Sequence, residues 1–482
     1  MSFADVPVFR HEGWTGTITS LRVGFRVKEN PAVVVVKSII TAIDTRHPIN
    51  NSVYVHACAD YADWTGDLDF LRKNLVRMRH AIRYALEEFD VREQGCVVVP
   101  WVGHDGRTGL VRGLDGKKTL RYGHGVGNNY WDLLPFGGQD LYATIYLFDA
   151  LNRLERIERD VQDHPEWKMP ADEAFPPEEL AELARTIRKT AGERFWHGMD
   201  GRFYGWIDRK GHAYDYGFTI LNLEAIYYGF ATTEQARSIL DWLDGKRVIE
   251  GDNSSGEDLY HWRFGPRATT KRNVETYCWV WSAPESIPWG GQVQDGGAVL
   301  GFSYFDLMAR LKINGPDDAW TRLKAILDWF EEVQAEGGYR AYYAKPGRGT
   351  LQGGGPPGGL GMDHEFMESV MVPQVMLYGF LGVEPKLGTL SIRPNLPSTW
   401  PSLTVTNVQI NDWVVDLTGE KDAVVVKVMR PGTQPLAVAL RPGVWRVKPL
   451  NGTPERRQTV AEGDTILVNS GVRLERVGED AD

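Results

Sequence analysis

Two kinds of helical segment alternate along the middle of the chain, and this alternation limits the folds that the chain can adopt. The amphipathic segments carry Glu, Arg and Lys along one side: Glu178–Trp196, Thr233–Leu243 and Asp318–Glu332. The others are apolar nearly all round: Phe218–Phe230, Ala298–Met308 and Val370–Phe380. A helix that is apolar on every side must be buried on every side. The pattern predicts an inner ring of buried helices wrapped by an outer ring, which is an (α/α)6 toroid.

Helical patterns extend from about Asn51 to Phe380, with about ten helices. A clear example is Asp67–Phe89, where apolar residues recur at steps of three and four. A simple helical bundle is the alternative to the toroid. The long loops favour the toroid, since they are rich in Gly and aromatic residues, hold many acidic residues and are of a length that usually carries function: Val98–Gly138, Gly245–Gly291 and Gly337–Met362.

The pattern changes to short strands after Val383, with turns of Pro, Gly and Asn between them. We expect strands at Leu390–Ile392, Leu403–Val408, Trp413–Leu417, Ala423–Val428, Leu436–Leu440 and Thr465–Val468. Near the N-terminus, Trp14–Val23 has the alternation and β-branched residues of a strand. The fold class predicted is therefore mainly α, with a short β segment in residues 1–30, the toroid in 31–383 and an antiparallel β-sandwich in 384–482.

Composition excludes several classes of function. The net charge of −10 argues against binding to nucleic acid or to an anionic membrane. No apolar run reaches the length of a membrane span. Cys58, Cys96 and Cys278 are too few and too scattered for a zinc cluster or a disulfide framework, and we expect neither a metal nor a cofactor. The lack of a visible secretion signal favours the cytoplasm. The oligomeric state is not indicated.

The aromatic content gives a first indication of a ligand. The chain has 17 Trp, 19 Tyr and 18 Phe, whose rings can fill a large core or offer flat surfaces to sugars. In the segment Gly127–Gly138, Asn129, Tyr130 and Trp131 stand directly before Asp132. Burial among aromatic rings would keep a carboxyl protonated, which suits a general acid. We expect Asp132 to be this acid and its three neighbours to contact the substrate. A helix-capping role is the alternative, and it fits Asp140 better.

A second acidic segment precedes the apolar helix at Val370. It contains Asp363, His364, Glu365 and Glu368. The helix macrodipole stabilises acids at this position and accounts for at least one of them. Three exceed what capping needs, so we expect the catalytic base to be Asp363, Glu365 or Glu368, with His364 in contact with the substrate.

A third junction of this kind is Trp289–Ala298, in which Gln292, Gln294 and Asp295 could bind several sugar hydroxyls. We expect Trp289 to take part as well. The glycines here do not make a phosphate loop, because no Gly-Lys-Ser/Thr sequence follows. Weaker examples of such polar loop segments are Asp44–Asn51, Asp215–Phe218 and Glu257–Arg263. In the last of them we expect Trp262 and Arg263 to contact the substrate. The inner helices of a toroid all start at one end, so these groups should converge there.

Four segments resemble the six-hairpin glycosidases, a superfamily that includes α-L-rhamnosidases, trehalases, glucoamylases and disaccharide phosphorylases. Trp131-Asp132 is similar to the signature that carries the general acid in several members. Tyr61–Leu71 resembles a helix junction common in the superfamily, and Leu387–Pro394 the start of the rhamnosidase-type C-terminal β domain. Gly16–Arg22 looks like the last strand of a preceding β-sandwich. The resemblance implies a carbohydrate substrate and paired carboxylates. It departs at Tyr339–Pro346, where the rhamnosidase base would stand and no acid is present.

The sequence therefore predicts an inverting, exo-acting glycoside hydrolase, whose acid and base stand roughly 6.5–9.5 Å apart. One alternative is a phosphorylase, with His124, His261, Arg263 and Arg267 as candidate phosphate contacts. Another is a polysaccharide lyase or sugar epimerase that uses His124, His364 and Tyr130. The last is a carbohydrate-binding protein without catalysis.

Overall fold

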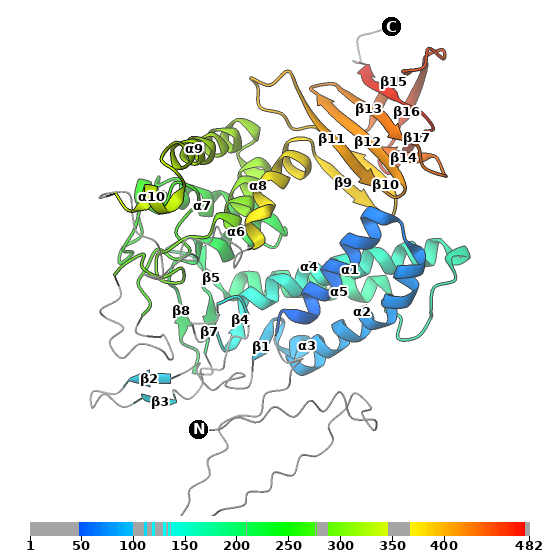
Figure 1. The fold of residues 1–482 in the computed structure, drawn as a ribbon. Helices are drawn as coiled ribbons and strands as arrows, with labels where there is room; N and C mark the ends of the chain where they lie inside the picture. The colour runs from blue at the N-terminus through cyan, green and yellow to red at the C-terminus, as the bar shows by residue number, and fades with distance from the viewer. Residues whose placement is uncertain are drawn as a thin grey trace, which may run out of the picture.

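The computed structural model describes residues 48–99, 110–112, 118–120, 129–131, 134, 136–208, 210–274, 276, 288–345 and 367–477. The predicted β segment in residues 1–30 lies outside this part of the chain. The described residues form a helical part, with a buried apolar cluster from Val55 to Phe380, and a β part, with a second cluster from Leu381 to Leu474. The domain boundaries at 30 and 383 stay predictions. Figure 1 shows the β part beside the helices at the C-terminal end of the chain.

The helical part is built largely of helical hairpins. Its α-helices are α1 Asn50–Thr65, α2 Leu68–Glu88, α3 Val91–Gln94, α4 Leu141–Asp163, α5 Pro177–Arg194, α6 Thr219–Tyr227, α7 Thr233–Leu243, α8 Ser303–Ile313, α9 Pro316–Ala335 and α10 Tyr339–Tyr343. Helix α1 packs against α2, α4 against α5, α6 against α7 and α8 against α9. The first helix of each pair also contacts the first helix of the next pair, in the order α1, α4, α6, α8. These contacts are those expected for paired helices of a toroid, while the division into an inner and an outer ring and its closure stay predictions.

Local sequence signals account for where several helices start and stop. The Asp67 side chain accepts a hydrogen bond from Phe70 N (2.8 Å) and begins α2. A capping box of Thr232 and Gln235 begins α7. Helix α1 ends at Gly66, whose φ of 60° is costly for a residue with a side chain. Helix α6 is buried from Thr219 to Ile226, as its apolar sequence predicts.

Two predicted helices differ from the observed ones. The segment predicted at Ala298–Met308 begins as a 3₁₀ turn, Leu300–Phe302, and continues as α8 to Ile313. The segment predicted as a wholly apolar helix at Val370–Phe380 is a 3₁₀ helix, Met367–Gln374, followed by a π-helical turn, Val375–Phe380. Pro373 removes a backbone donor from this segment, and Val370 is 64% exposed. Further 3₁₀ turns are Pro165–Trp167 and Gly256–Tyr260.

A small sheet lies at the start of α4 (Figure 1), and its strands were not predicted from the sequence. Its antiparallel strands follow the order β1 Val97–Val99, β4 Gly138–Asp140, β7 Trp206–Ile207 and β8 Ala213–Tyr214. Two separate hairpins pair β2 Leu110–Arg112 with β3 Lys118–Leu120, and β5 Trp196–His197 with β6 Arg202–Phe203. The sheet matters for the site because β4 leads directly into α4.

The β part contains two sheets. One has the order β17 Thr465–Val468, β14 Leu436–Ala439, β10 Thr389–Ile392 and β9 Val383–Lys386. The other has the order β11 Ser402–Ile410, β12 Trp413–Glu420, β13 Ala423–Arg430, β18 Val472–Val477, β15 Gly443–Pro449 and β16 Arg456–Val460. All pairs are antiparallel except β10 with β14, which corrects the purely antiparallel expectation. All six predicted strands are present; β9, β15, β16 and β18 are additional.

The β part is tied to the end of α1 through residues of two segments that resemble glycosidase motifs. Leu387 N donates to Asp63 Oδ1 (3.0 Å), and Asn411 N donates to Trp64 O (2.8 Å). A Cβ on Gly66 would lie 2.7 Å from Asn411 Oδ1, so a side chain there would disturb this contact. Within the described residues, no helix combines the length and the apolar character that a membrane span requires.

Candidate active site

Asn129 anchors the loop that leads to Asp132. The Asn129 side chain is 5% exposed and donates from Nδ2 to Asp140 Oδ2 (2.8 Å). Its Oδ1 accepts from the backbone N–H of Trp131 (2.8 Å). Asp140 in turn caps α4, since its Oδ1 accepts from Ala143 N (3.0 Å). The backbone of Trp131 is thus held at the N-terminus of a buried helix, and the predicted capping role of Asp140 is confirmed.

The Asp140 carboxyl is fully buried, and burial raises its pKa from 3.8 to about 7. The hydrogen bonds from Ala143, Asn129 and Tyr142 act in the opposite direction and offset part of this effect. Asp140 therefore titrates near neutral pH. Its two oxygens are occupied by the cap and by Asn129, which makes it a structural acid of the site.

Trp131 packs into a cluster of aromatic rings. Its ring centroid lies 4.9 Å from that of Phe218, the residue that begins α6, and 6.0 Å from that of Phe136. Phe136 continues the cluster to Trp206 at 4.7 Å. The side chain of Trp131 is 0% exposed. The ring therefore fixes the loop against the start of α6, and contact between this ring and a sugar stays a prediction.

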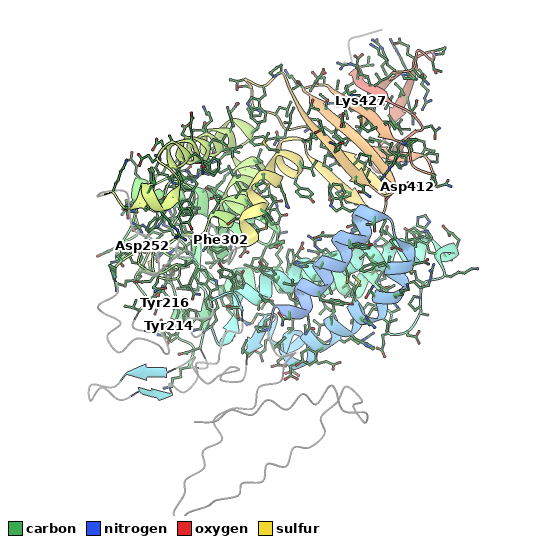
Figure 2. The ribbon with its side chains drawn as sticks, viewed as in Figure 1. Tyr214, Tyr216, Asp252, Phe302, Asp412 and Lys427 are labelled. Atoms are coloured by element: carbon green, nitrogen blue, oxygen red, sulfur yellow. The ribbon has the colours of Figure 1, made fainter. Side chains whose placement is uncertain are left out.

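Tyr130 connects the same loop to the start of α8. Its ring lies 5.3 Å from that of Phe302, in the 3₁₀ turn that precedes α8, and 6.3 Å from that of Trp131. The turn Leu300–Phe302 also packs against the 3₁₀ helix Met367–Gln374. The segments that lead into α4, α6 and α8 and the 3₁₀ helix Met367–Gln374 therefore meet at one place. Tyr216, of the ring cluster, and Phe302 are both labelled in Figure 2.

The polar turn Gln292–Asp295 reaches the same region through Thr269. Thr269 forms a β-bridge with Phe218, and its hydroxyl accepts from Gly296 N (3.0 Å). Asn273 holds the turn, since its N–H donates to Asp295 Oδ1 (3.0 Å) and its Nδ2 donates to Gln294 O (2.6 Å). Asp295 is 0% exposed. The structure thus brings Gln294 and Asp295 close to the start of α6, with Gln292 half-buried beside them.

Trp262 and Trp289 flank this turn, whereas Arg263 does not. Trp262 Nε1 donates to Gly296 O (3.4 Å), and Trp289 Nε1 donates to Ser254 Oγ (2.9 Å). Arg263 has a φ of 61° and pairs with Glu332 of α9 at 2.6 Å. Its guanidinium is engaged on an outer helix, and a substrate contact by Arg263 stays a prediction. Trp289 is half-buried, and its contact with a substrate stays a prediction as well.

The predicted catalytic acids lie outside what the structure describes. Asp132, Asp363, His364 and Glu365 are not among the described residues, and for Glu368 only the backbone is described, in Met367–Gln374. Their neighbours define where they are attached: Trp131 precedes Asp132, and Met367 follows the segment with the other three. Asp132, Asp363, Glu365 and Glu368 therefore stay predictions as catalytic residues.

Sequence analysis missed a buried acid on helix α6. Glu224 of α6 is 1% exposed, and its Oε1 accepts from Tyr146 Oη of α4 (2.8 Å). Burial raises the pKa of Glu224 from 4.5 to about 8, while hydrogen bonds from Tyr146 and Tyr142 lower it in part. The sequence does contain a signal for it. Glu224 is the one acid in the apolar segment Phe218–Phe230, and a buried acid requires a hydrogen-bonding partner or a proton.

One group among the described residues has the composition of a cation site. His197, Asp200 and Asp215 offer ligand atoms within 4.8 Å of one another. The Arg202 guanidinium lies 2.9 Å from Asp215 Oδ2 and already supplies a positive charge to it. The His197 ring lies 2.8 Å from Asp200 at the turn between β5 and β6. These contacts account for the cluster without a metal.

Comparison with known proteins gives weak similarities. No family model matches the chain, and no curated protein matches it. Among solved structures, a GH78 rhamnosidase of Bacillus sp. GL1 is 14% identical with a TM-score of 0.45, covering 81% of this chain and 31% of its own. A putative kojibiose phosphorylase from the human microbiome is 12% identical with a TM-score of 0.37, covering 88% of this chain and 46% of its own.

A GH63 mannosylglycerate hydrolase from Thermus thermophilus is 12% identical with a TM-score of 0.41, covering 66% of this chain and 75% of its own. The chain spans less than half of the length of the rhamnosidase and of the phosphorylase. These similar structures are six-hairpin glycosidases, the superfamily whose motifs the sequence resembles.

Proposed function

We propose that this protein is an inverting, exo-acting glycoside hydrolase built on an (α/α)6 toroid. In this reaction Asp132 donates a proton to the glycosidic oxygen as the bond to the leaving sugar breaks. A carboxylate among Asp363, Glu365 and Glu368 takes a proton from the water that attacks the anomeric carbon from the opposite face. Both protons are thereby accounted for, and no cofactor is needed.

The packing around the turn Leu300–Phe302 carries the proposal. Tyr130, two residues before Asp132, packs against Phe302 with a ring distance of 5.3 Å. The helix Met367–Gln374, which contains Glu368 and directly follows the other two acids, packs against the same turn. Two acidic segments separated by more than 220 residues in sequence are therefore attached to one short turn, as a pair of catalytic carboxylates requires.

The described surroundings supply the other groups that a sugar site uses. The turn Gln292–Asp295 offers amide and carboxylate groups, and Trp289 is half-buried next to it. Aromatic rings with polar neighbours bind sugar faces and hydroxyls together. These groups support a carbohydrate as the substrate.

The phosphorylase alternative needs cations that are available to phosphate, and three of its four candidates are already engaged. Arg267 donates to Asp258 Oδ1 (3.0 Å) and to Gly296 O (2.6 Å). Arg263 pairs with Glu332 at 2.6 Å, and His261 lies 3.7 Å from Asp258. His124 lies outside the described residues. This favours water over phosphate as the attacking group.

The test is a screen of aryl glycosides and oligosaccharides with and without phosphate. We expect turnover without phosphate and a fall in kcat of about 10²–10⁴-fold in Asp132→Asn. Glu365→Gln, Asp363→Asn and Glu368→Gln are compared in parallel, and the base is the one whose change causes a similar fall. Asp163→Asn is the matched control, an exposed acid at the opposite end of α4 that should leave kcat unchanged.

Each other outcome selects an alternative. Turnover that requires phosphate supports the phosphorylase. Unsaturated or epimerised products support the lyase or epimerase. Sugar binding without turnover supports the non-catalytic protein. The anomer that first appears, followed by NMR, tests inversion.

A further inference from the structure

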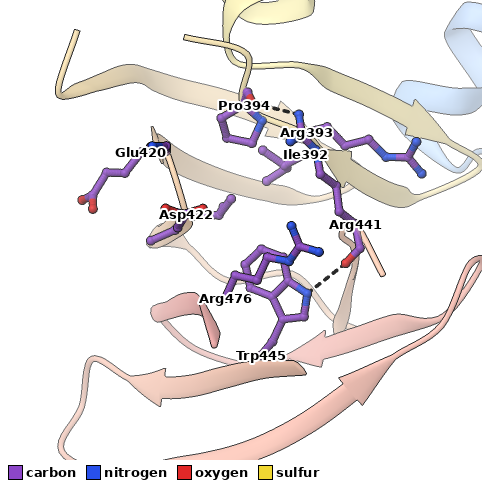
Figure 3. Close-up of a pocket in the computed structure, with 11 residues that line it drawn as sticks. Ile392, Arg393, Pro394, Glu420, Asp422, Arg441, Trp445 and Arg476 are labelled. Carbon is purple, nitrogen blue, oxygen red and sulfur yellow. Dashed lines mark hydrogen bonds between the residues drawn. The ribbon is translucent and has the colours of Figure 1, made fainter. Parts of the chain in front are cut away.

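A pocket in the β part, away from the helix ends described above, combines arginines with acceptor groups (Figures 1 and 3). It is shallow, with a cavity volume of about 30 Å³, and reaches about 340 Å³ only when the open solvent space at its mouth is included. Its lining comes from the end of β10, the turn between β12 and β13, the segment between β14 and β15, and the ends of β15 and β18. Four of the lining residues are cations: Arg393, Lys421, Arg441 and Arg476.

Two of these arginines are held in place by backbone carbonyls. Arg441 Nη2 donates to Pro394 O (3.1 Å), and Arg476 Nη2 donates to Pro442 O (3.2 Å). Trp445 Nε1 donates to Arg441 O (2.9 Å), which fixes the backbone under the pocket. Figure 3 shows Arg441 and Arg476 extending into the space between Pro394 and Trp445. Because these bonds are to carbonyls, they orient the guanidinium groups without neutralising their charge.

The charge balance favours a ligand with a single anionic group. Within the described part of the chain, no carboxylate lies within ion-pair distance of Arg441 or Arg476. Glu420, on the pocket wall, is paired through both oxygens with Arg473 (2.8 and 2.7 Å). Asp422 also lines the pocket and is exposed. The carboxylate of Asp422 would repel a second anionic group of a ligand, but it accepts hydrogen bonds from hydroxyl groups.

We propose that this pocket binds the carboxylate of a hexuronic acid residue of a glycan, whose sugar ring lies at the open side of the pocket. The planar carboxylate of the sugar matches the donor fork of arginine, here Arg441 and Arg476. The hydroxyl groups of the same ring donate to the exposed Asp422. The ligand class rests on the proposed function, since both concern glycans. The β part would then hold an acidic glycan while the helical part cleaves it.

The test measures binding without turnover. Full-length Asp132→Asn is titrated by calorimetry with D-glucuronate, D-glucose, acetate and inorganic phosphate at equal ionic strength. We expect glucuronate to bind at least 10-fold more tightly than the other three, and less tightly as salt is raised. Arg441→Ala and Arg476→Ala should each weaken binding at least 10-fold. Arg441→Lys should recover only part of the loss, because lysine keeps the charge and lacks the fork.

Arg456→Ala is the control, an exposed arginine of β16 outside the pocket, and it should bind like the parent chain. Equal binding of glucuronate and glucose would overturn the proposal, and so would equal binding of acetate or phosphate, which marks a general anion site. Binding that survives both arginine-to-alanine changes would place the ligand elsewhere and also overturn it.

The acidic sequence after Val477, Gly478–Asp482, could compete for the arginines, so a chain ending at Val477 is titrated as well. Binding seen only in that chain supports the pocket, and no binding in either chain refutes it. Failure of the proposed hydrolase would appear as missing turnover with this binding intact, so the two proposals fail separately.

Discussion

A carboxylic acid inside an apolar helix requires a hydrogen-bonding partner, a proton, or both, and Glu224 has both. Tyr146 Oη donates to its Oε1 at 2.8 Å. Burial raises the pKa of Glu224 to about 8. The acid therefore keeps its proton at neutral pH and neighbours Tyr142 and Tyr146 as a neutral group. Asp140, with a pKa of about 7, is the second acid near the junction that titrates late.

These raised pKa values predict that stability falls as pH rises. The folded chain holds a proton on Glu224 that the unfolded chain releases above its ordinary pKa of 4.5. The free energy of unfolding therefore decreases between about pH 4.5 and 8 by up to about 1.4 kcal/mol per pH unit from this one group. In Glu224→Gln the amide oxygen can still accept from Tyr146, and this contribution disappears. We expect the variant to gain stability over the wild type as pH is raised, measured by urea unfolding from pH 5 to 9.

Asp163→Asn serves as the control, since this exposed acid should leave the pH dependence unchanged. Wild-type and Glu224→Gln curves that run parallel across this range would show that Glu224 is ionised in the folded chain.

At the scale of elements, the loop before α4 is fixed by one side chain. Asn129 joins the cap residue Asp140 to the backbone of Trp131. This couples the position of the residue after Trp131 to the start of a buried helix. A small displacement of a catalytic group can lower the rate by about 100-fold, so the coupling bears directly on the proposed reaction.

Asn129→Ala tests this coupling. It leaves the N–H of Trp131 and one oxygen of Asp140 without these partners, and we expect the free energy of unfolding to fall by about 1–3 kcal/mol. We also expect kcat to fall at least 10-fold, while KM changes less, because the proposed acid is displaced and the rest of the sugar site is kept. Denaturant unfolding and steady-state kinetics measure the two effects. Asn314→Ala, which removes a bond to Asp318 at the surface, is the control; a kcat in Asn129→Ala equal to that of the control would contradict the coupling.

Elements with strong local signals could be predicted from the sequence. Helix α2 follows the apolar stripe of Asp67–Phe89, and α7 starts at the expected Thr233. The strands β1, β4, β7 and β8 have two or three residues each, too few to show a period. At Val370–Phe380 the apolar composition correctly predicted a helical segment. With Pro373 inside it, the segment begins as a 3₁₀ helix instead of an α-helix.

The candidate site was predictable only where its contacts join residues that are close in sequence. Capping by Asp140 is a local interaction, visible in the spacing to the helix that follows. The meeting of Tyr130 with Phe302 and of Glu224 with Tyr146 depends on helix packing between distant segments, which local patterns do not specify. The left-handed backbone of Arg263 and its ion pair with Glu332 of α9 are likewise not specified by local patterns, and its contact with a sugar stays a prediction.

At the scale of the whole molecule, the helical and β parts are joined at the end of α1. Asp63 is 6% exposed and accepts from two distant groups, Leu387 N through Oδ1 (3.0 Å) and Arg156 Nη2 through Oδ2 (2.5 Å). It therefore links α1, α4 and the turn between β9 and β10. Trp64 adds a backbone contact to Asn411 and a hydrogen bond to Tyr378 Oη (3.1 Å). Residues of two segments that resemble glycosidase motifs thus join the helical part to the β part.

Asp63→Ala should loosen this connection. The change leaves Leu387 N–H and Arg156 without their shared acceptor, and we expect a loss of about 1–3 kcal/mol in the free energy of unfolding. We expect one calorimetric transition in the parent. Because each part has its own apolar core, we expect this transition to broaden or split in the variant, with the β part and the helices unfolding at different temperatures. Asp60→Ala is the matched control on the same helix, since Asp60 is 60% exposed and pairs with Arg153 at the surface. If both variants keep one sharp transition with equal midpoints, the parts are held together by apolar packing, and the contact at Asp63 contributes little to their coupling.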